Sequence, residues 1–553
     1  MNPLTLQSIA QALWMKEYDR AKIPPHILER IESEKNSEGA YAERFIGRLD
    51  QLEANQLSFV PARAERYALL RRHCLEKAAL SPREFYASCL FLGPESITGY
   101  EPIPLDPTFK FPEIDLPQLK KQLGWHFFVG NFTDDAGKHY SVELMFWQYS
   151  LLPPPLAADF GLSDIENQSL ELHLAICDPQ TGLQYRANTV VVAGTTGLVE
   201  VKSNPFTYRL GHNSIEGLSA NGDLFPVRLR ARGWDMGKSP DVEIEIDLSL
   251  DNSKGYFLQG EGGCSPSVDG LGTLYYSASL LKLLPGAESS ITISGKRIAL
   301  TGGSMWYDHQ WTTGFMPVGA PQHAVMRAAN NLSKAAPGGW DWFELQFRAT
   351  QAIVGPGEVQ MTFSALHSWA NEAFYWQTGP TPPGQMTVPL NGKFIDERNL
   401  TTNISGTMTV TNWVKNDTSP NPAVYPPTNT WYPAGYRFTI DQELAPWLKE
   451  FTLTPLIASG QTGFFGTGLQ YTEGGVVIRD VEGNEIGRGF AEGTNWARTT
   501  DTVVTAAGLP VNEQTRALLT PVVPSELLVI ESGLYCELEQ AELKKILAAA
   551  KGL

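Results

Sequence analysis

Residues 256–311 read YFLQGEGGCSPSVDGLGTLYYSASLLKLLPGAESSITISGKRIALTGGSMWYDHQW, and this stretch decides the fold that we expect. Short runs rich in β-branched and aromatic residues alternate with Gly-rich turns, as is typical of antiparallel strands. The stretch ends with an acid and an imidazole, Asp308 and His309, between Trp306 and Trp311. Burying titratable groups in an aromatic strand is costly, so this end is the first candidate for a functional site.

Strand-like alternation continues on both sides of this stretch. The clearest example is DVEIEIDLSL at 241–250, where aliphatic residues alternate with acids and Ser, so that one buried and one solvated face are predicted. The same period recurs in 140–147 and 171–176, and a second run of strands follows Pro337-Gly338-Gly339. Many short strands with frequent turns predict a mainly β chain built as antiparallel barrels or sandwiches.

The two ends of the chain have a different pattern. Residues 1–95 carry apolar residues at helical spacing, and Ser81-Pro82-Arg83-Glu84 forms a helix start with a capping box, so a small helical bundle, a helical cover or a docking module is expected. A Pro-rich segment then predicts an extended linker or strap. The expected division is a helical region at 1–95, a linker at 96–122, β-domains at 123–330 and 331–520, and a C-terminal helical extension at 521–553.

The charge and hydrophobic composition of the chain indicate which kinds of binding partner to expect. The 553 residues hold 43 Lys and Arg against 60 Asp and Glu, a formal net charge of −17, which argues against nucleic acid and anionic membrane surfaces. The hydrophobic share is 42 %, with 14 Trp, 19 Tyr and 25 Phe, enough to fill β cores and line an apolar pocket. No apolar run is long enough to span a bilayer, so no stable membrane insertion is expected.

The cysteine pattern and the absence of several sequence motifs bear on disulfides, cofactors and metals. Five scattered Cys without a CxxC pattern, and no signal-peptide pattern, favour reduced thiols and a cytoplasmic location. No phosphate loop, dinucleotide fingerprint, HExxH or GxSxG occurs, and the nine His show no metal-ligand spacing, so neither cofactor nor metal is expected.

Asp308 and His309 allow two interpretations. Adjacent strand residues point to opposite faces, so only one of the two should face a central cavity unless a bulge re-aims the other. A carboxylic acid in an aromatic pocket has a raised pKa and can protonate an alkene or carbonyl, and an imidazole can orient it or return the proton. The alternative is a structural Asp–His hydrogen bond that joins two β-bodies.

Other side chains are weaker candidates, each with a plain packing alternative. Either phenol of Tyr275 and Tyr276 can line a pocket, or both can be core residues. Trp342 shares a face with Glu344, where an indole beside a carboxylate can stabilise a developing cation or simply fill the core. Gln148, after Trp147, can contact a ligand or occupy a satisfied rim position.

Three pieces of the opening stretch carry a family resemblance: LQGEGG at Leu258–Gly263, YYS at Tyr275–Ser277 and WYDHQW at Trp306–Trp311. Together with ELMFWQYSL, GWDWFELQF, YTEGGVVI and GRGFAEG, in that order along residues 143–493, they resemble the AttH/CrtC-type double-lipocalin family. That family includes carotenoid 1,2-hydratases, kievitone-hydratase-like enzymes and lipocalin-like Diels–Alderases.

The resemblance implies two lipocalin-like β-barrels or sandwiches, packed together, with an apolar ligand pocket in or between them. It also implies that Asp308 donates a proton to a carbon–carbon double bond, with His309 as its neighbour and Tyr276 as the motif tyrosine. Two departures concern the substrate and the reaction: Trp147-Gln148 replaces a usual Phe-Arg, and Ala278-Ser279-Leu280 lacks a usual basic residue.

The leading hypothesis is a cofactor-free enzyme of secondary metabolism that hydrates, isomerises or cyclises a large polyene, terpenoid-like or polyketide molecule near the junction of the two barrels. The alternatives are a shape-driven pericyclase and a non-catalytic carrier of an apolar ligand, and the number of subunits stays open. The catalytic candidates are Asp308, His309 and Tyr276, and the substrate-binding candidates are Trp306, Trp147, Gln148, Tyr275, Trp342 and Glu344.

Overall fold

The computed structural model describes residues 100–494, apart from internal gaps. The longer gaps are 314–336, 349–357, 369–378 and 419–428, and short ones fall at 105, 151–153, 160–162, 194–198, 236–241 in part, 266–271, 459–461 and 465–469. The helices predicted within 1–95 and 521–553 lie outside the described residues, as does the boundary predicted at 330.

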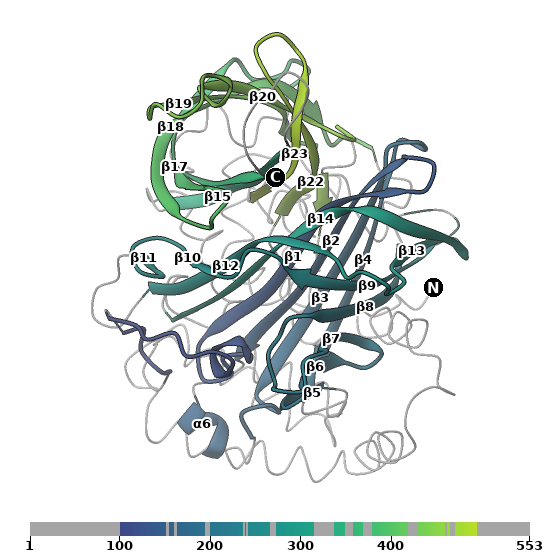
Figure 1. Ribbon diagram of the computed structural model, residues 1–553, viewed down its shortest axis with the longest axis vertical. Coiled ribbons are helices and arrows are strands. Elements are labelled where there is room, and N and C mark those ends of the chain that lie inside the picture. The colour runs from purple at the N-terminus through teal and green to yellow at the C-terminus, as the bar shows by residue number, and fades with distance from the viewer. Residues whose placement is uncertain are drawn as a thin grey trace, which may run out of the picture.

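The first β-body is one large antiparallel sheet (Figure 1). Its central strands run in the order β4-β3-β2-β1-β14-β12-β9-β8-β7-β6-β5, and β10, β11 and β13 pair at its side. Its strands are β1 Leu123–Asp134, β2 His139–Ser150, β3 Gln168–Asp178, β4 Leu183–Val192, β5 Val199–Ser203, β6 Phe206–Leu210, β7 Asn213–Gly217, β8 Val227–Asp235, β9 Val242–Asn252, β10 Phe257–Leu258, β11 Cys264–Ser265, β12 Gly272–Leu283, β13 Ser290–Ile293 and β14 Lys296–Thr313.

The second β-body is a closed antiparallel barrel. Eight strands follow one another as β20-β19-β18-β17-β16-β15-β23-β22, β20 pairs with β22 to close the ring, and β21 pairs with β22. Closure leaves no unpaired edge among those eight strands. The strands are β15 Pro337–Phe347, β16 Val359–Ser368, β17 Met386–Ile395, β18 Thr401–Lys415, β19 Trp431–Ile440, β20 Glu450–Pro455, β21 Thr462–Phe464, β22 Gln470–Arg479 and β23 Glu485–Thr494.

The mainly β, antiparallel prediction is confirmed, but the two bodies differ. The second closes by hydrogen bonding, whereas the first curls until β4 lies close to β8 and β9 without a ladder between them. Within the described residues, the named helical elements are α6 Pro154–Asp159 and the short 3-10 turns η2 Glu113–Asp115 and η3 Pro446–Leu448, and Ala193 is also helical.

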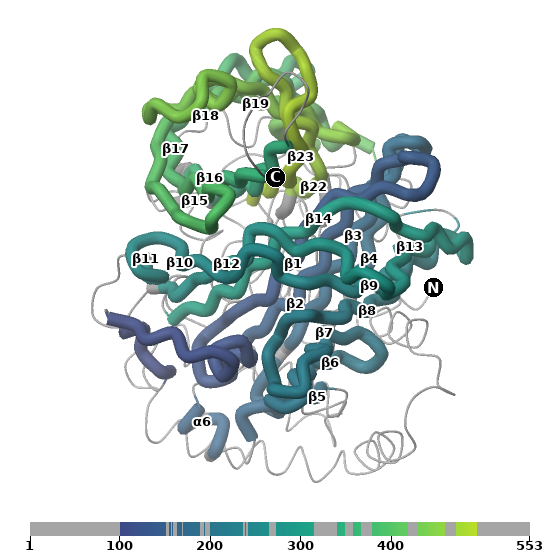
Figure 2. The backbone as a smooth tube through the Cα atoms, viewed as in Figure 1, coloured from purple at the N-terminus to yellow at the C-terminus, as the bar shows by residue number. Residues whose placement is uncertain are grey.

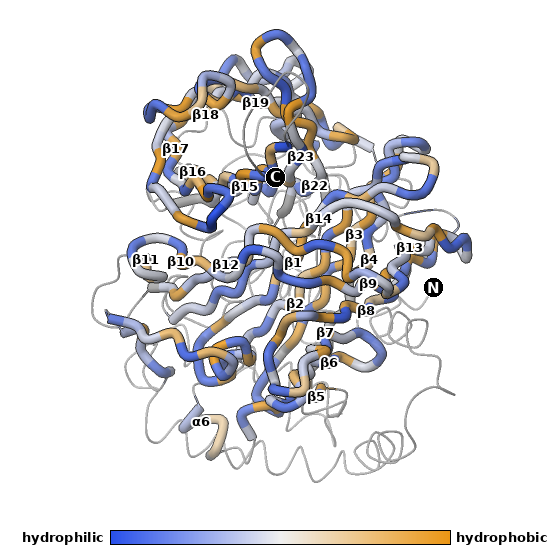
Figure 3. The backbone as a smooth tube through the Cα atoms, in the orientation of Figure 1, coloured by the Kyte–Doolittle hydropathy of each residue, from blue (hydrophilic) through white to orange (hydrophobic). Residues whose placement is uncertain are grey.

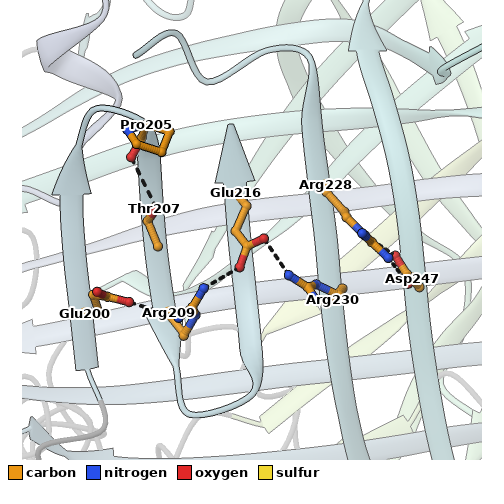
Figure 4. Close-up of polar contacts among 8 residues, drawn as sticks. All are labelled: Glu200, Pro205, Thr207, Arg209, Glu216, Arg228, Arg230 and Asp247. Atoms are coloured by element: carbon orange, nitrogen blue, oxygen red, sulfur yellow. Dashed lines mark hydrogen bonds and ion pairs between the residues drawn. The ribbon is translucent and has the colours of Figure 1, made fainter. Parts of the chain in front are cut away.

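Alternation along β9 is confirmed, and its polar face lies outside. There and on β5–β8, charged side chains form a ladder across the strands (Figure 4). Arg209 bridges Glu200 and Glu216, and Arg230 also binds Glu216 at 2.6 Å. These half-exposed pairs each contribute little stability, but they keep this face of the sheet wet and specify its register.

Alternation misleads for β2 and β3, where both faces are buried. The polar positions of β2, such as Glu143, look solvated in sequence but are covered by the second body, because β2 lies against β22. The described residues hold two separate apolar cores, one inside each body. Figure 3 shows hydrophobic and polar residues interspersed along the strands of both.

Specific contacts join the two bodies. The Lys254 ammonium donates to the backbone oxygens of Glu358 (2.8 Å) and Asp396 (2.7 Å) and to Oε1 of Gln360 (2.7 Å). The side chain of Asn131 donates to the carbonyl of Gly489 at 3.1 Å. Since a cation with three acceptors holds strands of the second body against the first, the junction is a bonded interface.

Residues 101–122, the Pro-rich segment, run as a strap across one end of the first body, shown in purple in Figure 2. Ile103 joins the first core, and the ring of Phe111 stacks on Tyr256 with a centroid distance of 4.3 Å. The turn Glu113–Asp115 points Asp115 inward, where it is only 1 % exposed. The strap therefore brings one carboxyl into the first body.

Candidate functional site: two buried acids on opposite faces of one sheet

Asp308 lies in the middle of the sheet, on the face turned toward the second body. On β14 it is paired with Phe127 of β1 and Ser277 of β12. Its carboxylate accepts hydrogen bonds from the hydroxyls of Tyr275 and Ser277 and from Nε1 of Trp306 at 2.6 Å. Both carboxylate oxygens of Asp308 are therefore held by donors from β12 and from β14 itself.

The surroundings of Asp308 are aromatic and dry. The side chain is 2 % exposed, and the ring of Trp342 lies 6.1 Å from Trp306 and 5.6 Å from Phe127. Burial raises the pKa of Asp308 to about 7, although the hydrogen bonds from Ser277, Tyr275 and Trp306 act to lower it. A carboxyl with a pKa near neutrality can both give and take a proton.

Glu344, on β15 of the second body, is the acid opposite Asp308. It is fully buried, and no hydrogen bond of normal geometry reaches either carboxylate oxygen. Burial holds its pKa well above the ordinary value, the amide of Gln346 lowers it, and the charge of Asp308 raises it further. The protonated form of Glu344 is therefore favoured more than in an ordinary glutamic acid, so the junction holds two carboxyls whose surroundings differ.

His309 faces the other way, into the first body. Its Nδ1 lies 3.1 Å from the hydroxyl of Tyr276, and that hydroxyl also bonds the carboxylate of Asp115 on the strap. Its ring stacks on His126 at 3.9 Å. Burial and the neighbouring His126 hold the pKa of His309 well below its ordinary value, so the imidazole is neutral.

The strand rule that only one of Asp308 and His309 faces a given side is followed here. The imidazole is not brought to Asp308, and the predicted Asp–His hydrogen bond is replaced by separate partners for each. Of the tyrosines, Tyr275 contacts Asp308, whereas the motif tyrosine Tyr276 joins His309. The catalytic set predicted from the sequence is therefore divided between two faces of the sheet.

The remaining predicted residues are also divided. Trp306, Trp342 and Glu344 surround the Asp308 side. Trp147 lies on that side of β2, with its ring 5.1 Å from Trp125. Gln148 instead donates to the strap carbonyl of Gln118 at 3.0 Å, as a satisfied rim residue does.

Asp115 was not among the residues predicted from the sequence. Burial raises its pKa to about 7, while the hydroxyls of Tyr276 and Tyr256 lower it and the charge of Asp223 raises it. It stands in a Pro-rich segment without strand or helix period, so only its neighbourhood in space identifies it. A carboxylate flanked by Pro112 and Pro117, where repeated prolines hold the chain extended, is the one local signal available.

Further acids line the same junction. Glu473 and Glu492, paired across β22 and β23, lie near Glu143 of β2. Burial raises the pKa of both Glu473 and Glu492, and Glu143 raises them further by its charge, while Arg186 lowers that of Glu473. The junction therefore gathers several buried carboxyls, and the pKa values of Glu473 and Glu492 among them are raised.

Two negative findings concern only the residues that the structure describes. Among them no group of His, Cys, Asp and Glu is arranged to hold a metal ion. None of the helices within them is long and apolar enough to cross a membrane.

The comparisons with known proteins agree with the resemblance read from the motifs. A family model described as AttH-like matches residues 103–355, which span the strap, the first body and the first strand of the barrel. The match covers less than half of the chain, and with it the resemblance predicted from the sequence is confirmed. No curated protein matches the chain.

Two solved structures are similar to the chain. The crystal structure of an AttH candidate from Nitrosomonas europaea aligns with a TM-score of 0.52 and 17 % identity, covering 72 % of this chain and 99 % of that one. Kievitone hydratase from Nectria haematococca aligns with a TM-score of 0.43 and 14 % identity over 72 % and 99 %. At 17 % identity the first of these shows a shared fold and nothing of its chemistry.

Proposed function

We propose that the chain is a cofactor-free enzyme that adds water to an apolar polyene, terpenoid-like or polyketide molecule at the junction of its two β-bodies. The observation that carries the proposal is Asp308, a buried carboxyl with a pKa near neutrality among indole and phenyl rings. Such a site keeps bulk water away from the acid and favours an apolar substrate, and the one water that reacts enters with the substrate.

The proposed reaction uses the Asp308 carboxyl first as an acid. Its proton adds to one carbon of the double bond, and the electron pair of that bond forms the new C–H bond. The other carbon becomes cationic, and the π faces of Trp306 and Trp342 stabilise that charge. Water then bonds to the cationic carbon, and the proton that it loses returns to Asp308, so the net change is the addition of one water.

The neighbours of Asp308 support this role in different ways. Tyr275 and Ser277 stabilise the carboxylate that forms after proton transfer, because both donate hydrogen bonds to it. Glu344, in its protonated form and without a strong partner, would donate a hydrogen bond to an oxygen on the substrate. His309 and Tyr276 have no part in this step, because they face the other side of the sheet.

The test is mass spectrometry of the purified protein incubated with acyclic polyenes, terpenoids and linear polyketides, wild type beside Asp308→Asn. A product heavier by one water, formed by wild type alone, is expected. An isomer of unchanged mass that the variant still forms would replace the proposal with a shape-driven cyclase. A ligand that co-purifies and never changes would identify a carrier. Asp251→Asn, an exposed site on β9, is the matched control.

A further inference from the structure

The interior of the first body contains a second set of polar groups, separated from Asp308 by the sheet itself. Asp115 comes from the strap, Tyr276 from β12, His309 from β14 and His126 from β1. All four are buried, at 1 % exposure or less. The four groups lie far apart in sequence and converge here, and the proposed hydration uses none of them.

Asp115, Tyr276 and His309 form a continuous hydrogen-bonded chain. The phenol has one hydrogen and stands between the carboxylate and Nδ1 of the imidazole. When it donates to Asp115, the Nδ1–H of His309 donates to the phenol oxygen; when Asp115 carries the proton, the phenol donates to Nδ1. This hydrogen-bonded chain of three side chains can therefore present either a donor or an acceptor to a ligand.

Two hydroxyls near this chain make no hydrogen bond of normal geometry. Tyr208 and Tyr307 are 1 % and 0 % exposed. The hydroxyl of Tyr208 has no partner, and the hydroxyl of Tyr307 interacts with that of Tyr276 without reaching normal hydrogen-bond geometry. Both rings lie around His126, at 5.3 and 6.1 Å between centroids. Buried hydroxyls are normally hydrogen-bonded, so two that make no bond of normal geometry beside one imidazole favour a site for a polar atom of a ligand.

The residues around this cluster indicate which kind of ligand would supply the polar atom. The rings of Phe146, Phe225 and Tyr256 pack against the cluster and are apolar on their faces. The cover is the strap rather than a strand: Phe109 and Phe111 both meet the ring of Tyr276 edge-on. The strap is held by these ring contacts and by single hydrogen bonds, such as that between Nε2 of His126 and the carbonyl of Asp115 at 2.8 Å, rather than by a strand ladder. Contacts of this kind can open locally to admit a ligand.

We propose that this interior cluster is a second ligand site, which binds an apolar molecule by a carbonyl or hydroxyl oxygen placed among Tyr208, Tyr276 and Tyr307. The strap closes over the ligand and brings Asp115 to the hydrogen-bonded chain. The site goes beyond the proposed hydration, because it lies on the opposite face of the sheet and uses different residues.

The test compares two probes of nearly equal shape, 2-acetylnaphthalene, which has a carbonyl, and 2-ethylnaphthalene, which lacks it. Equilibrium dialysis against the full chain should show the ketone bound at least about fivefold more tightly, as one or two net hydrogen bonds provide. Tyr307→Phe and Tyr276→Phe should bring this ratio close to one. Tyr275→Phe, the neighbour on the opposite face, should leave the ratio unchanged.

Three results would overturn the proposal. A ratio near one in wild type would mean that the hydroxyls serve only water. Binding of neither probe would exclude this class of ligand. If Tyr275→Phe abolished the preference for the ketone and Tyr276→Phe kept it, the ketone would bind at the junction instead. Tyr307→Phe removes a hydroxyl that makes no hydrogen bond of normal geometry, so thermal melting should show a folded variant. Turnover by Asp308 is measured separately.

Discussion

The two faces of strands β1, β14 and β12 carry similar buried polar residues, but each face is covered by a different part of the chain. Each face holds a buried aspartate with a pKa of about 7 that bonds a tyrosine from β12, Tyr275 on one side and Tyr276 on the other. On the junction face the cover is a closed barrel, and on the interior face it is a single strap held by ring contacts and individual hydrogen bonds.

This difference teaches how one sheet can hold two separate chemical environments. Side chains alternate with a period of two, so neighbouring residues such as Asp308 and His309 belong to different sites although they are consecutive. A rigid cover suits a carboxyl that must be kept dry while it transfers a proton, and a movable cover suits admission of a ligand. The predictions below test whether the two faces are as independent as their geometry indicates.

The largest effect is expected on turnover. Asp308→Asn removes the proton and should lower kcat for hydration by roughly 10²–10⁴-fold, the usual range for loss of a general acid. Asp115→Asn, on the other face, should change kcat only a few-fold. Product formation under saturating substrate is measured for both. If Asp115→Asn caused the larger loss, the reaction would belong to the interior face.

The next effect concerns pH and should be shared by the two faces. Asp308 and Asp115 keep their protons to about pH 7 when folded, against an ordinary pKa of 3.8. Between these values the folded state binds more protons than the unfolded state, so stability falls as pH rises and levels off above about 7. Each group contributes a slope of at most about 1.4 kcal/mol per pH unit.

Difference measurements isolate each aspartate. Glu344, Glu473 and Glu492 add slopes of the same sign, and His126 and His309, whose pKa values are lowered, add slopes of the opposite sign. Denaturant unfolding at several pH values between about 4 and 8 therefore compares wild type with Asp308→Asn and Asp115→Asn. Each variant should have the flatter curve, and an unchanged curve would mean that the missing group ionises normally.

Much of the fold could be predicted from the sequence, because period two is a local property. The strand at β9 and the turn at Gly260–Gly263, where Gly260, Gly262 and Gly263 have positive φ, are as the pattern indicates. The two-sided burial of β2 was not predictable, since Glu143 looks solvated until the second body covers it. Ring closure of the second body also depends on β20 meeting β22, which no local pattern encodes.

The candidate site was predictable in part for the same reason. The motif WYDHQW located both Asp308 and His309, and strand geometry separated them. Which tyrosine accompanies which group depends on the register of β12 against β14, where Tyr276 lies opposite His309 and Ser277 opposite Asp308. The flanking prolines were the one local signal for Asp115, and they do not show which way its side chain points, because the segment is irregular.

A smaller effect is expected from loosening the rigid cover. Lys254→Met removes the three hydrogen bonds from one ammonium to the second body and should destabilise the protein by roughly 1–3 kcal/mol. Hydration at the junction should slow more than ketone binding in the interior weakens, because only the junction depends on the barrel. Lys296→Met, an exposed cation at the start of β14, is the control. Equal losses at both sites would show that the two covers act together.

The smallest effect separates a ligand site from ordinary packing on the interior face. The hydroxyl of Tyr208 is buried without a partner, so Tyr208→Phe should leave thermal stability unchanged or raise it by up to about 1 kcal/mol. Tyr276→Phe should instead lower stability, because its hydroxyl bonds both Asp115 and His309. Calorimetry of both variants without ligand is the measurement. If Tyr208→Phe were as destabilising as Tyr276→Phe, its hydroxyl would already be satisfied, by water held in place, and the interior face would have no vacant position for a ligand oxygen there.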